Sequence, residues 1–497
     1  MTAGTLALGG VGAARTAHAA PGTERPNILF ILTDDQGWPT LGCYGGRLVP
    51  TPHLDRLASE GMRFTDAYVM PQCTPTRAAL LTGQHTARNR MWHVIPYYGT
   101  PFGRLREPVF REHLARETFT LAKGLRAAGY ATGTAGKWHL TNNADGNYLG
   151  LKSEAGVHYG FDHVSPPGPG SQNEGDKHVG YLTDRALAFA EQNRERPWFF
   201  YLAHHTIHGK VSAPEPLVAK YRAGGAPETG LHNATYLAAI EHLDTSIGRL
   251  LQGLDRLGQR ERTIVIFLSD NGGVDLAYAA RPFGEPLAPG ASTPTQLTVE
   301  RYEYDNAPLR MGKGSHYEGG IRVPCLVRWP GVTPAGHVSD VPVHVVDWVP
   351  TLLAAAGGKP PGGDHPLDGI DLAPVLRGGR GPGRALFWYL PFYEVRWGAT
   401  PAAIIREGDW KLIEFFGDWF DPQGRYVPGA RVELYQLRED IGEQRDRAAD
   451  EPARVRALQG KLHAWLRSVP AEIPGPNPDF DPRRQLLESR TKPAGWR

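Results

Sequence analysis

The chain has 497 residues, of which 41% are hydrophobic and 21% charged, and its formal net charge is +2. This length is sufficient for one large α/β domain and a smaller one, and the composition excludes general disorder. The nearly balanced charge gives no reason to expect a nucleic acid partner, and no window is apolar over the length of a membrane span.

The N-terminal residues predict export. Residues 4–14 are small and apolar, and Ala17-His18-Ala19 matches the A-x-A pattern of signal cleavage sites. The basic region that opens such signals is missing, so the signal is N-terminally incomplete, and a disordered Ala/Gly tail is the alternative. We therefore expect residues 1–25 to be an export signal or disordered, and the protein to be periplasmic or extracellular. The three cysteines are too few for a disulfide framework, so they add no support for export.

The first predicted strand covers residues 26–33, a continuous apolar run that is typical of a parallel strand buried on both faces. It ends in Asp34-Asp35, and acids at the carboxyl end of such a strand lie in the crevice where open α/β sheets bind ligands. Adjacent carboxylates repel each other unless a cation lies between them. A solvated turn or a helix cap is the alternative interpretation. A capped helix is predicted over residues 51–61.

A lone cysteine, Cys73, stands immediately before a predicted helix in which Thr74 is the N-cap and Gly83 ends the last turn. Backbone N–H groups and the helix dipole favour an anion at this place, and Arg77, one turn on, adds a fork of donors. The pattern predicts an oxyanion site in which the thiolate of Cys73 is stabilised. A buried structural cysteine beside a capped helix is the alternative.

The predicted strands over 130–135, 198–203 and 263–268 also end in polar side chains, and each follows a predicted helix. The stretches after them are Gly136-Lys137-Trp138-His139-Leu140, His204-His205-Thr206-Ile207-His208 and Ser269-Asp270-Asn271-Gly272-Gly273. Three clustered histidines indicate metal binding or proton transfer. The oxygen ligands of the last stretch suit Ca²⁺ or Mg²⁺, although an ordinary Asx turn is the alternative.

The second half of the chain continues the α/β pattern and then changes. Residues 274–305 are predicted to be an irregular loop, and the glycine-rich stretch 309–324 presents Lys313. Further on, short strands and a closing helix over 452–469 follow a Gly/Pro-rich linker. We therefore expect a large, mostly parallel sheet flanked by helices in a catalytic domain over 26–375. A smaller C-terminal antiparallel sheet with a helix is expected within 376–497.

Five stretches resemble the motifs of the formylglycine-dependent sulfatases, in the order that the family uses. They are Asn27-Ile-Leu-Phe-Ile-Leu-Thr-Asp-Asp35, Cys73-Thr-Pro-Thr-Arg77, Gly136-Lys-Trp-His-Leu140, Ser269-Asp-Asn-Gly-Gly273 and Gly312-Lys-Gly-Ser-His-Tyr-Glu-Gly-Gly320. The resemblance covers nearly the whole chain and implies an alkaline phosphatase-like fold. It also implies that a maturation enzyme oxidises Cys73 to Cα-formylglycine, whose hydrated aldehyde attacks the sulfur of a sulfate ester.

The same resemblance implies a role for each motif residue. A divalent cation, Ca²⁺ or Mg²⁺, would be held by Asp34, Asp35, Asp270, Asn271 and matured Cys73. The catalytic residues would be Arg77 and Lys137 on the sulfate oxygens, His139 as the base in sulfate release, and His208 and Lys313 at the leaving alcohol. The family often has Pro near the equivalent of His208, so His204 and His205 remain rivals for the acid role, and Thr141 stands where Gly is usual.

The C-terminal stretches 386–391, 406–413 and 433–437 resemble the subdomain of bacterial sulfatases that act on sulfated sugars. The predicted substrates are sulfated carbohydrates of galactose or N-acetylgalactosamine type, with aryl sulfates as artificial substrates. Trp388 and Trp397 could stack on sugar rings, or they could pack in the core. The alternatives are a phosphonate or phosphate ester hydrolase, a Cys–His thiol hydrolase, and a non-catalytic binder of sulfated glycans.

Overall fold

The computed structural model describes residues 25–171, 173–279, 297–301 and 303–489. The predicted export signal, apart from residue 25, lies outside the described residues, as does much of the loop predicted over 274–305. No helix in the described part of the chain is both long and apolar enough to cross a bilayer.

The main sheet has eight strands in the order β12-β2-β11-β8-β1-β7-β5-β6. The strands are β1 (Asn27–Thr33), β2 (Met62–Phe64), β5 (Ala131–Gly136), β6 (His163–Val164), β7 (Trp198–Ala203), β8 (Thr263–Ser269), β11 (Cys325–Arg328) and β12 (His337–Ser339). In the centre, β1 pairs in parallel with β7 and β8, and β5 is parallel to β7. Antiparallel pairing is confined to β11, which lies between β8 and β2. The carboxyl ends of the central parallel strands therefore meet at one edge of the sheet.

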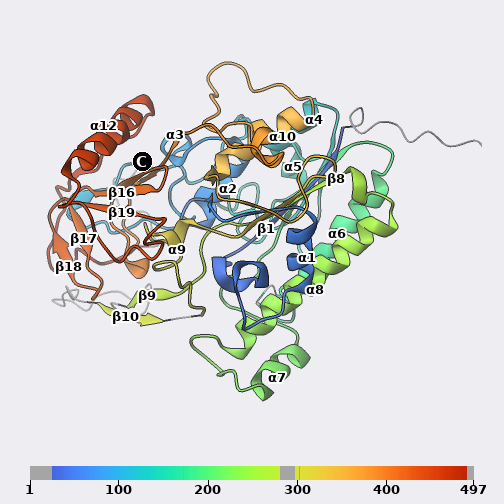
Figure 1. Cartoon of the computed structure of the whole chain (residues 1–497), viewed down its shortest axis with the longest axis horizontal. Helices are drawn as coiled ribbons and strands as arrows, with labels where there is room; N and C mark the ends of the chain where they lie inside the picture. The colour runs from blue at the N-terminus through green and yellow to red at the C-terminus, as the bar shows by residue number, and fades with distance from the viewer. Residues whose placement is uncertain (1–24, 172, 280–296, 302, 490–497) are drawn as a thin grey trace, which may run out of the picture.

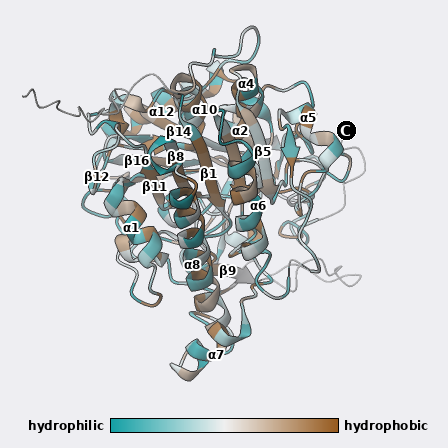
Figure 2. Ribbon diagram, turned by 90° about the vertical axis from the view of Figure 1, so that its right-hand side faces the viewer, coloured by the Kyte–Doolittle hydropathy of each residue, from teal (hydrophilic) through white to brown (hydrophobic). Residues whose placement is uncertain are grey.

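Helices cover both faces of this sheet, as Figures 1 and 2 show. One face packs against α2 (Cys73–Thr82), α4 (Leu121–Ala127) and α10 (Trp348–Ala355), and the other against α1 (Pro52–Glu60), α6 (Val179–Gln192) and α8 (Ala234–Arg256). Successive side chains of β1 alternate between the two cores, with Phe30 in the first and Ile31 in the second. This two-sided burial explains why β1 is apolar throughout its length and confirms the prediction of a buried central strand.

Smaller elements join the layers. The short strand pairs are β3 (Ala67–Tyr68) with β13 (Val343–His344), β4 (Leu105–Arg106) with β20 (Gly475–Pro476), β9 (Leu276–Ala279) with β10 (Thr298–Arg301), and β17 (Asp418–Phe420) with β18 (Tyr426–Pro428). The short helices are α3 (Thr86–Asn89), α5 (Gly156–Tyr159), α7 (Glu215–Ala223), α9 (Glu318–Ile321) and α11 (Ala373–Leu376). The pairing of β9 with β10 corrects the prediction that 274–305 is irregular throughout, because the partners lie too far apart in sequence for local patterns to reveal them.

The C-terminal part contains a four-stranded antiparallel sheet in the order β14-β15-β16-β19. These strands are β14 (Ala385–Leu390), β15 (Ala402–Glu407), β16 (Trp410–Phe415) and β19 (Arg431–Gln436), and α12 (Pro452–Ser468) packs on β15 and β16. Figure 1 shows this sheet and α12 at the left of the molecule, beside the main sheet. The predicted fold class is confirmed. Trp388 is fully buried and Trp397 is 8% exposed, so both pack in the core.

A buried ion-pair network joins the C-terminal sheet to the main part of the chain. The ammonium group of Lys411, on β16, lies 3.1 Å from Glu318 Oε1 at the start of α9 and 2.7 Å from Glu443 Oε1. All three side chains are inaccessible to solvent. Removing one member of such a network leaves a buried charge without its partner, which is far more costly than breaking a pair at the surface.

We expect Lys411→Met to lower the free energy of unfolding by about 3–5 kcal/mol, since the carboxylate of Glu443 would stay buried without its cation. The matched control is Lys461→Met, which breaks a solvent-exposed pair with Glu407 and should cost less than about 1 kcal/mol. Denaturant unfolding followed by fluorescence measures both changes. Equal losses in the two variants would show that the buried network does not hold the sheet in place.

Candidate active site

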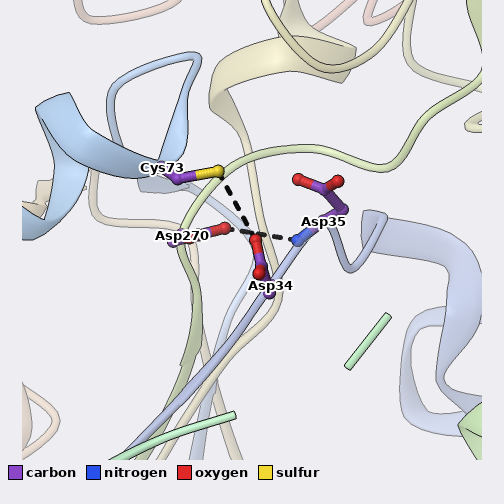
Figure 3. A group of neighbouring side chains, drawn as sticks. All are labelled: Asp34, Asp35, Cys73 and Asp270. Carbon is purple, nitrogen blue, oxygen red and sulfur yellow. Dashed lines mark hydrogen bonds between the residues drawn. The ribbon is translucent and has the colours of Figure 1, made fainter. Parts of the chain in front are cut away.

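The ends of β1 and β8, which were predicted to carry acidic residues, lie next to each other beside Cys73. Asp34 and Asp35 follow β1, Asp270 follows β8, and Cys73 is at the start of α2 (Figure 3). Each of the four buried residues offers one potential ligand atom, and these atoms lie within 4.8 Å of one another. The Sγ atom of Cys73 lies 3.5 Å from Asp34 Oδ1, and the Asp35 N–H donates to Asp270 Oδ1 at 3.2 Å. The structure thus brings together residues that are far apart in the sequence.

Each carboxylate of this cluster has a buried cationic partner. The contacts are Lys137 Nζ to Asp34 Oδ2 at 2.6 Å, Lys313 Nζ to Asp35 Oδ2 at 2.8 Å, and Arg77 Nη2 to Asp270 Oδ2 at 2.7 Å. The guanidinium of Arg77 also donates from Nη1 to the carbonyl of Lys137 at 3.0 Å, which fixes its plane. Three cations are therefore held by ion pairs in a small volume, where they can bind the oxygens of a tetrahedral anion.

Burial and charge act in opposite directions on the acids. Burial raises the pKa of Asp34, but Lys137 and the neighbouring cations outweigh it and hold that pKa well below its usual range. At Asp270, burial and the charge of Asp34 outweigh the opposing effect of Arg77 and raise the pKa to about 6. Burial alone would lower the pKa of Lys313, yet Asp35 raises it, so the ammonium group stays charged. Asp270 is therefore the acid of this cluster whose charge is least compensated.

The oxygen atoms of this cluster suit a hard divalent cation. Asn271 donates from Nδ2 to Asp35 Oδ1 at 2.8 Å, while its Oδ1 is buried without a hydrogen-bond partner among the described residues. A buried amide oxygen that lacks a donor is expected where a metal ion completes its coordination. The predicted donor set of three carboxylates and one amide oxygen therefore fits Ca²⁺ or Mg²⁺.

The structure corrects two predictions about the cysteine helix. The N-cap of α2 is Gln72, so Cys73 is its first residue, and the hydroxyl of Thr74 donates instead to the carbonyl of His139 at 2.9 Å. The structure also gives no support to a stabilised thiolate from the protein groups alone, because burial and the carboxylate of Asp270 raise the pKa of the Cys73 thiol. Gly83 does end the helix in the left-handed conformation, as predicted.

His139 and His208 lie beside the cluster, and their ring nitrogens have different contacts. The Nε2 atom of His139 lies 2.7 Å from the carbonyl of Ile95, and its Nδ1 is buried without a partner in the described structure. Nε2 of His208 lies 4.0 Å from Asp35 Oδ2, and 40% of this side chain is exposed. Burial and the charge of Lys137 hold the pKa of His139 well below its usual range, so its imidazole is neutral and able to accept a proton.

The two rival histidines for the acid role, His204 and His205, are both buried. His204 is fully buried, and neither ring nitrogen has a partner among the described residues. His205 is also buried, and burial together with Lys137 holds its pKa well below the ordinary value. For His208, which keeps 40% of its side chain exposed, partial burial and the charge of Lys313 lower the pKa. Of the three, His208 combines a contact with the acid cluster and an exposed ring.

Sequence reasoning missed two residues beside the site. The ammonium group of Lys177 is buried and donates to the carbonyl of Lys210 at 2.8 Å, just beyond His208. Tyr148, which is 47% exposed, has its ring centroid 6.3 Å from that of His139 in an edge-to-face arrangement. Neither residue belongs to a strand end or to a recognised motif, so spacing in the sequence gave no signal for them.

The fold is an eight-stranded α/β sheet with helices on both faces, and the candidate site lies at the carboxyl ends of its central strands. A family model described as sulfatase matches residues 26–358, and a model of the C-terminal part of N-sulphoglucosamine sulphohydrolase matches residues 311–471. The chain therefore belongs to the sulfatase family, and it is a sulfuric ester hydrolase.

Three relatives illustrate this similarity. The chain is 34% identical to human arylsulfatase A over 75% of this chain and 72% of that protein. It is 33% identical to N-acetylgalactosamine-6-sulfatase of Canis lupus familiaris over 77% of this chain and 71% of the relative. The crystal structure of Ps i-CgsB in complex with k-i-k-neocarrahexaose matches with a TM-score of 0.68 and 24% identity, covering 90% of this chain and 95% of that one.

The buried, protonated thiol predicts low reactivity. In folded protein carrying unmodified Cys73, we expect iodoacetamide at about pH 8 to label this residue at least about tenfold more slowly than in unfolded protein, because alkylation requires an accessible thiolate. Cys325, which is equally buried, is the matched control and should be protected to a similar degree. Peptide mass spectrometry measures the labelling. Rapid labelling of Cys73 alone would show that its thiolate is accessible and stabilised.

Proposed function

We propose that the protein hydrolyses sulfate esters of carbohydrates and releases inorganic sulfate, using Cα-formylglycine made from Cys73 and a divalent cation. The convergence of Cys73, three carboxylates and three paired cations at one sheet edge is the observation that carries this proposal. Formylglycine would supply a hydrated aldehyde as the nucleophile, and the cation, Ca²⁺ or Mg²⁺, would polarise the sulfate group.

The protein side chains would bind and orient the sulfate group. Arg77 and Lys137 would donate to its oxygens, and their ion pairs with acids fix them before the substrate arrives. This arrangement lowers the reorganisation needed as negative charge moves during the reaction. Lys313, which is paired with Asp35, would stabilise charge on the leaving oxygen.

Two histidines would move protons. The unpartnered Nδ1 of His139 would take a proton during sulfate release, while the contact of its Nε2 with the Ile95 carbonyl keeps the ring in place. His208, with its exposed ring, would assist the leaving alcohol from the side of Asp35. The lowered pKa of His208 means that this assistance depends on the charge of the bound sulfate, which favours the protonated imidazole.

The relatives support a carbohydrate substrate. One is described as an N-acetylgalactosamine-6-sulfatase, a similar structure contains a bound oligosaccharide, and the C-terminal part matches a sulphoglucosamine sulphohydrolase model. Glycans of galactose or N-acetylgalactosamine type are the proposed substrates. Aryl sulfates would serve as artificial substrates. A formylglycine-generating enzyme is the proposed maturation partner, and export to the periplasm or beyond is proposed from the A-x-A pattern at Ala17–Ala19.

The central test compares protein preparations that differ in the maturation of Cys73. Protein produced with and without a formylglycine-generating enzyme is assayed on nitrophenyl sulfate, nitrophenyl phosphate and a panel of sulfated saccharides. Peptide mass spectrometry reports the fraction of Cys73 that is converted, and activity on sulfates should rise in proportion to this fraction. Full activity with a free thiol would overturn the mechanism. A preference for the phosphate ester would favour the phosphatase alternative, and binding without turnover by matured protein would favour the glycan binder.

Metal content is tested separately. Active protein should contain a divalent cation by elemental analysis, and Asp270→Asn should reduce both the bound metal and the activity, because the substitution removes a charged ligand and leaves Arg77 unpaired. Circular dichroism checks that this variant folds. Active protein without bound metal would contradict the proposed role of the acid cluster.

The role of His208 is tested through the leaving group. His208→Ala should reduce turnover of saccharide sulfates, whose alcohols need a proton, by about 100-fold or more, while nitrophenyl sulfate should lose far less. The matched variant is His204→Ala, which alters a neighbouring histidine without an acid partner. Similar losses on both substrates in His208→Ala would contradict the assignment.

A further inference from the structure

A cavity of about 190 Å³ lies beside the active site and has no assigned role. Its inner wall includes Gly136, which directly precedes Lys137, and His205, which follows β7. Tyr148, Ser165 and His178 are among the residues on its other sides. We refer to this cavity, of whose lining these five residues are part, as the neutral cavity.

The position of Tyr148 is set by its connection to the active site. This residue lies in a tight turn in which Asn147 N donates to the Gly150 carbonyl at 3.0 Å. The N–H of His139 donates to the Asn147 carbonyl, also at 3.0 Å, so the turn is tied to the backbone of His139. As a result, a half-exposed aromatic ring is held at the border between the neutral cavity and His139.

The opposite wall is also well ordered by hydrogen bonds. Asp176 accepts from the N–H groups of His178 and Gly180 at 3.0 and 2.8 Å, which fixes the start of α6. Nε2 of His178 lies 3.0 Å from the Pro169 carbonyl, and Ser165 N donates to the carbonyl of Thr134 at 2.9 Å. The cavity therefore has fixed walls on both sides.

Charge distinguishes this cavity from the site next to it. None of the described residues that line it is Asp, Glu, Lys or Arg, whereas the adjacent cluster contains three acids and three cations. The lining instead combines an aromatic ring and apolar side chains with hydroxyl, amide, imidazole and backbone groups; the apolar side chains are Leu149, Pro167 and Leu182. Such a surface suits a ligand that has an apolar face and hydroxyl groups but no formal charge, because a buried charge would find no partner there.

We infer that the neutral cavity binds an uncharged sugar ring of the substrate, with Tyr148 packed on the apolar face of that ring. This inference rests on the proposed carbohydrate substrate and narrows it, since the sugar in this subsite carries neither a second sulfate nor a uronate carboxylate. The sulfate group to be cleaved occupies the cationic centre, which is formed by Arg77 and Lys137. The neutral cavity selects the sugar ring next to it. Tyr148 is thus a specificity-determining residue.

The experiment measures inhibition of nitrophenyl sulfate hydrolysis by matured enzyme. The probes are the neutral disaccharides galactobiose and lactose, with inorganic sulfate as the probe of the cationic centre. Tyr148→Ala should weaken inhibition by at least one of these disaccharides about threefold to tenfold and leave inhibition by inorganic sulfate unchanged. Tyr148→Phe, which keeps the ring, should restore disaccharide inhibition, and Leu48→Ala, at another exposed apolar side chain, should change neither.

A second pair of probes tests the charge selectivity. Digalacturonic acid and its dimethyl ester differ in the charge of their carboxyl groups, and we expect only the ester to inhibit in a manner that depends on Tyr148. Equal dependence on Tyr148 for the free acid would overturn the exclusion of charge. Disaccharide inhibition that is absent, or unchanged in Tyr148→Ala, would overturn the sugar subsite.

The design separates this inference from the proposed function. If matured enzyme does not hydrolyse nitrophenyl sulfate, the proposed function fails, and binding of the same disaccharides to wild type and Tyr148→Ala is then read by saturation-transfer NMR. Binding that requires Tyr148 would support the subsite independently of turnover. Absence of binding to wild type in that measurement would overturn it.

Discussion

Three carboxylates buried within reach of one another cannot remain charged without compensation, and this constraint determines the arrangement of the active site. A charge that is buried without a partner costs several kcal/mol, so each acid requires its own cation. The cations come from different parts of the chain: Arg77 from α2, Lys137 from the end of β5 and Lys313 from the segment before α9. Neutralising the acids therefore also fixes these segments relative to β1 and β8. The same contacts that permit folding hold the three cationic side chains in position.

The parallel centre of the sheet is what allows the acids to meet. Because β1 and β8 run side by side in the same direction, Thr33 lies opposite Ser269, and the residues that follow each strand emerge at the same level. The N–H of Asp270 donates to the carbonyl of Thr33 at 3.0 Å, which extends the strand pairing as far as the acids themselves. Strand register thus converts two distant sequence motifs into one cluster.

The sequence was sufficient to predict the parts that depend on local patterns. Continuous apolar runs located the central strands, and the polar residues that follow them include the acids, the histidines and Lys137 of the candidate site. Contacts distant in sequence caused the errors. Thr74 has the residue type and position of an N-cap, yet it bonds to His139, 65 residues away. A thiolate of Cys73 was expected to be stabilised at a helix start, but burial and the carboxylate of Asp270, which follows another strand, have the opposite effect on its pKa.

Hydrogen bonding distinguishes the buried cluster around Lys411 from the acid cluster of the candidate site. Around Lys411, both oxygens of Glu318 and both of Glu443 have partners, including Tyr68 and the N–H of Glu318, so that network is closed. In the active site, by contrast, Asn271 Oδ1 and His139 Nδ1 are buried without partners in the described part of the chain. An unsatisfied buried polar atom costs free energy unless a ligand or a water molecule satisfies it. The closed network is therefore structural, whereas the open positions of the other cluster are available to a ligand atom or a proton.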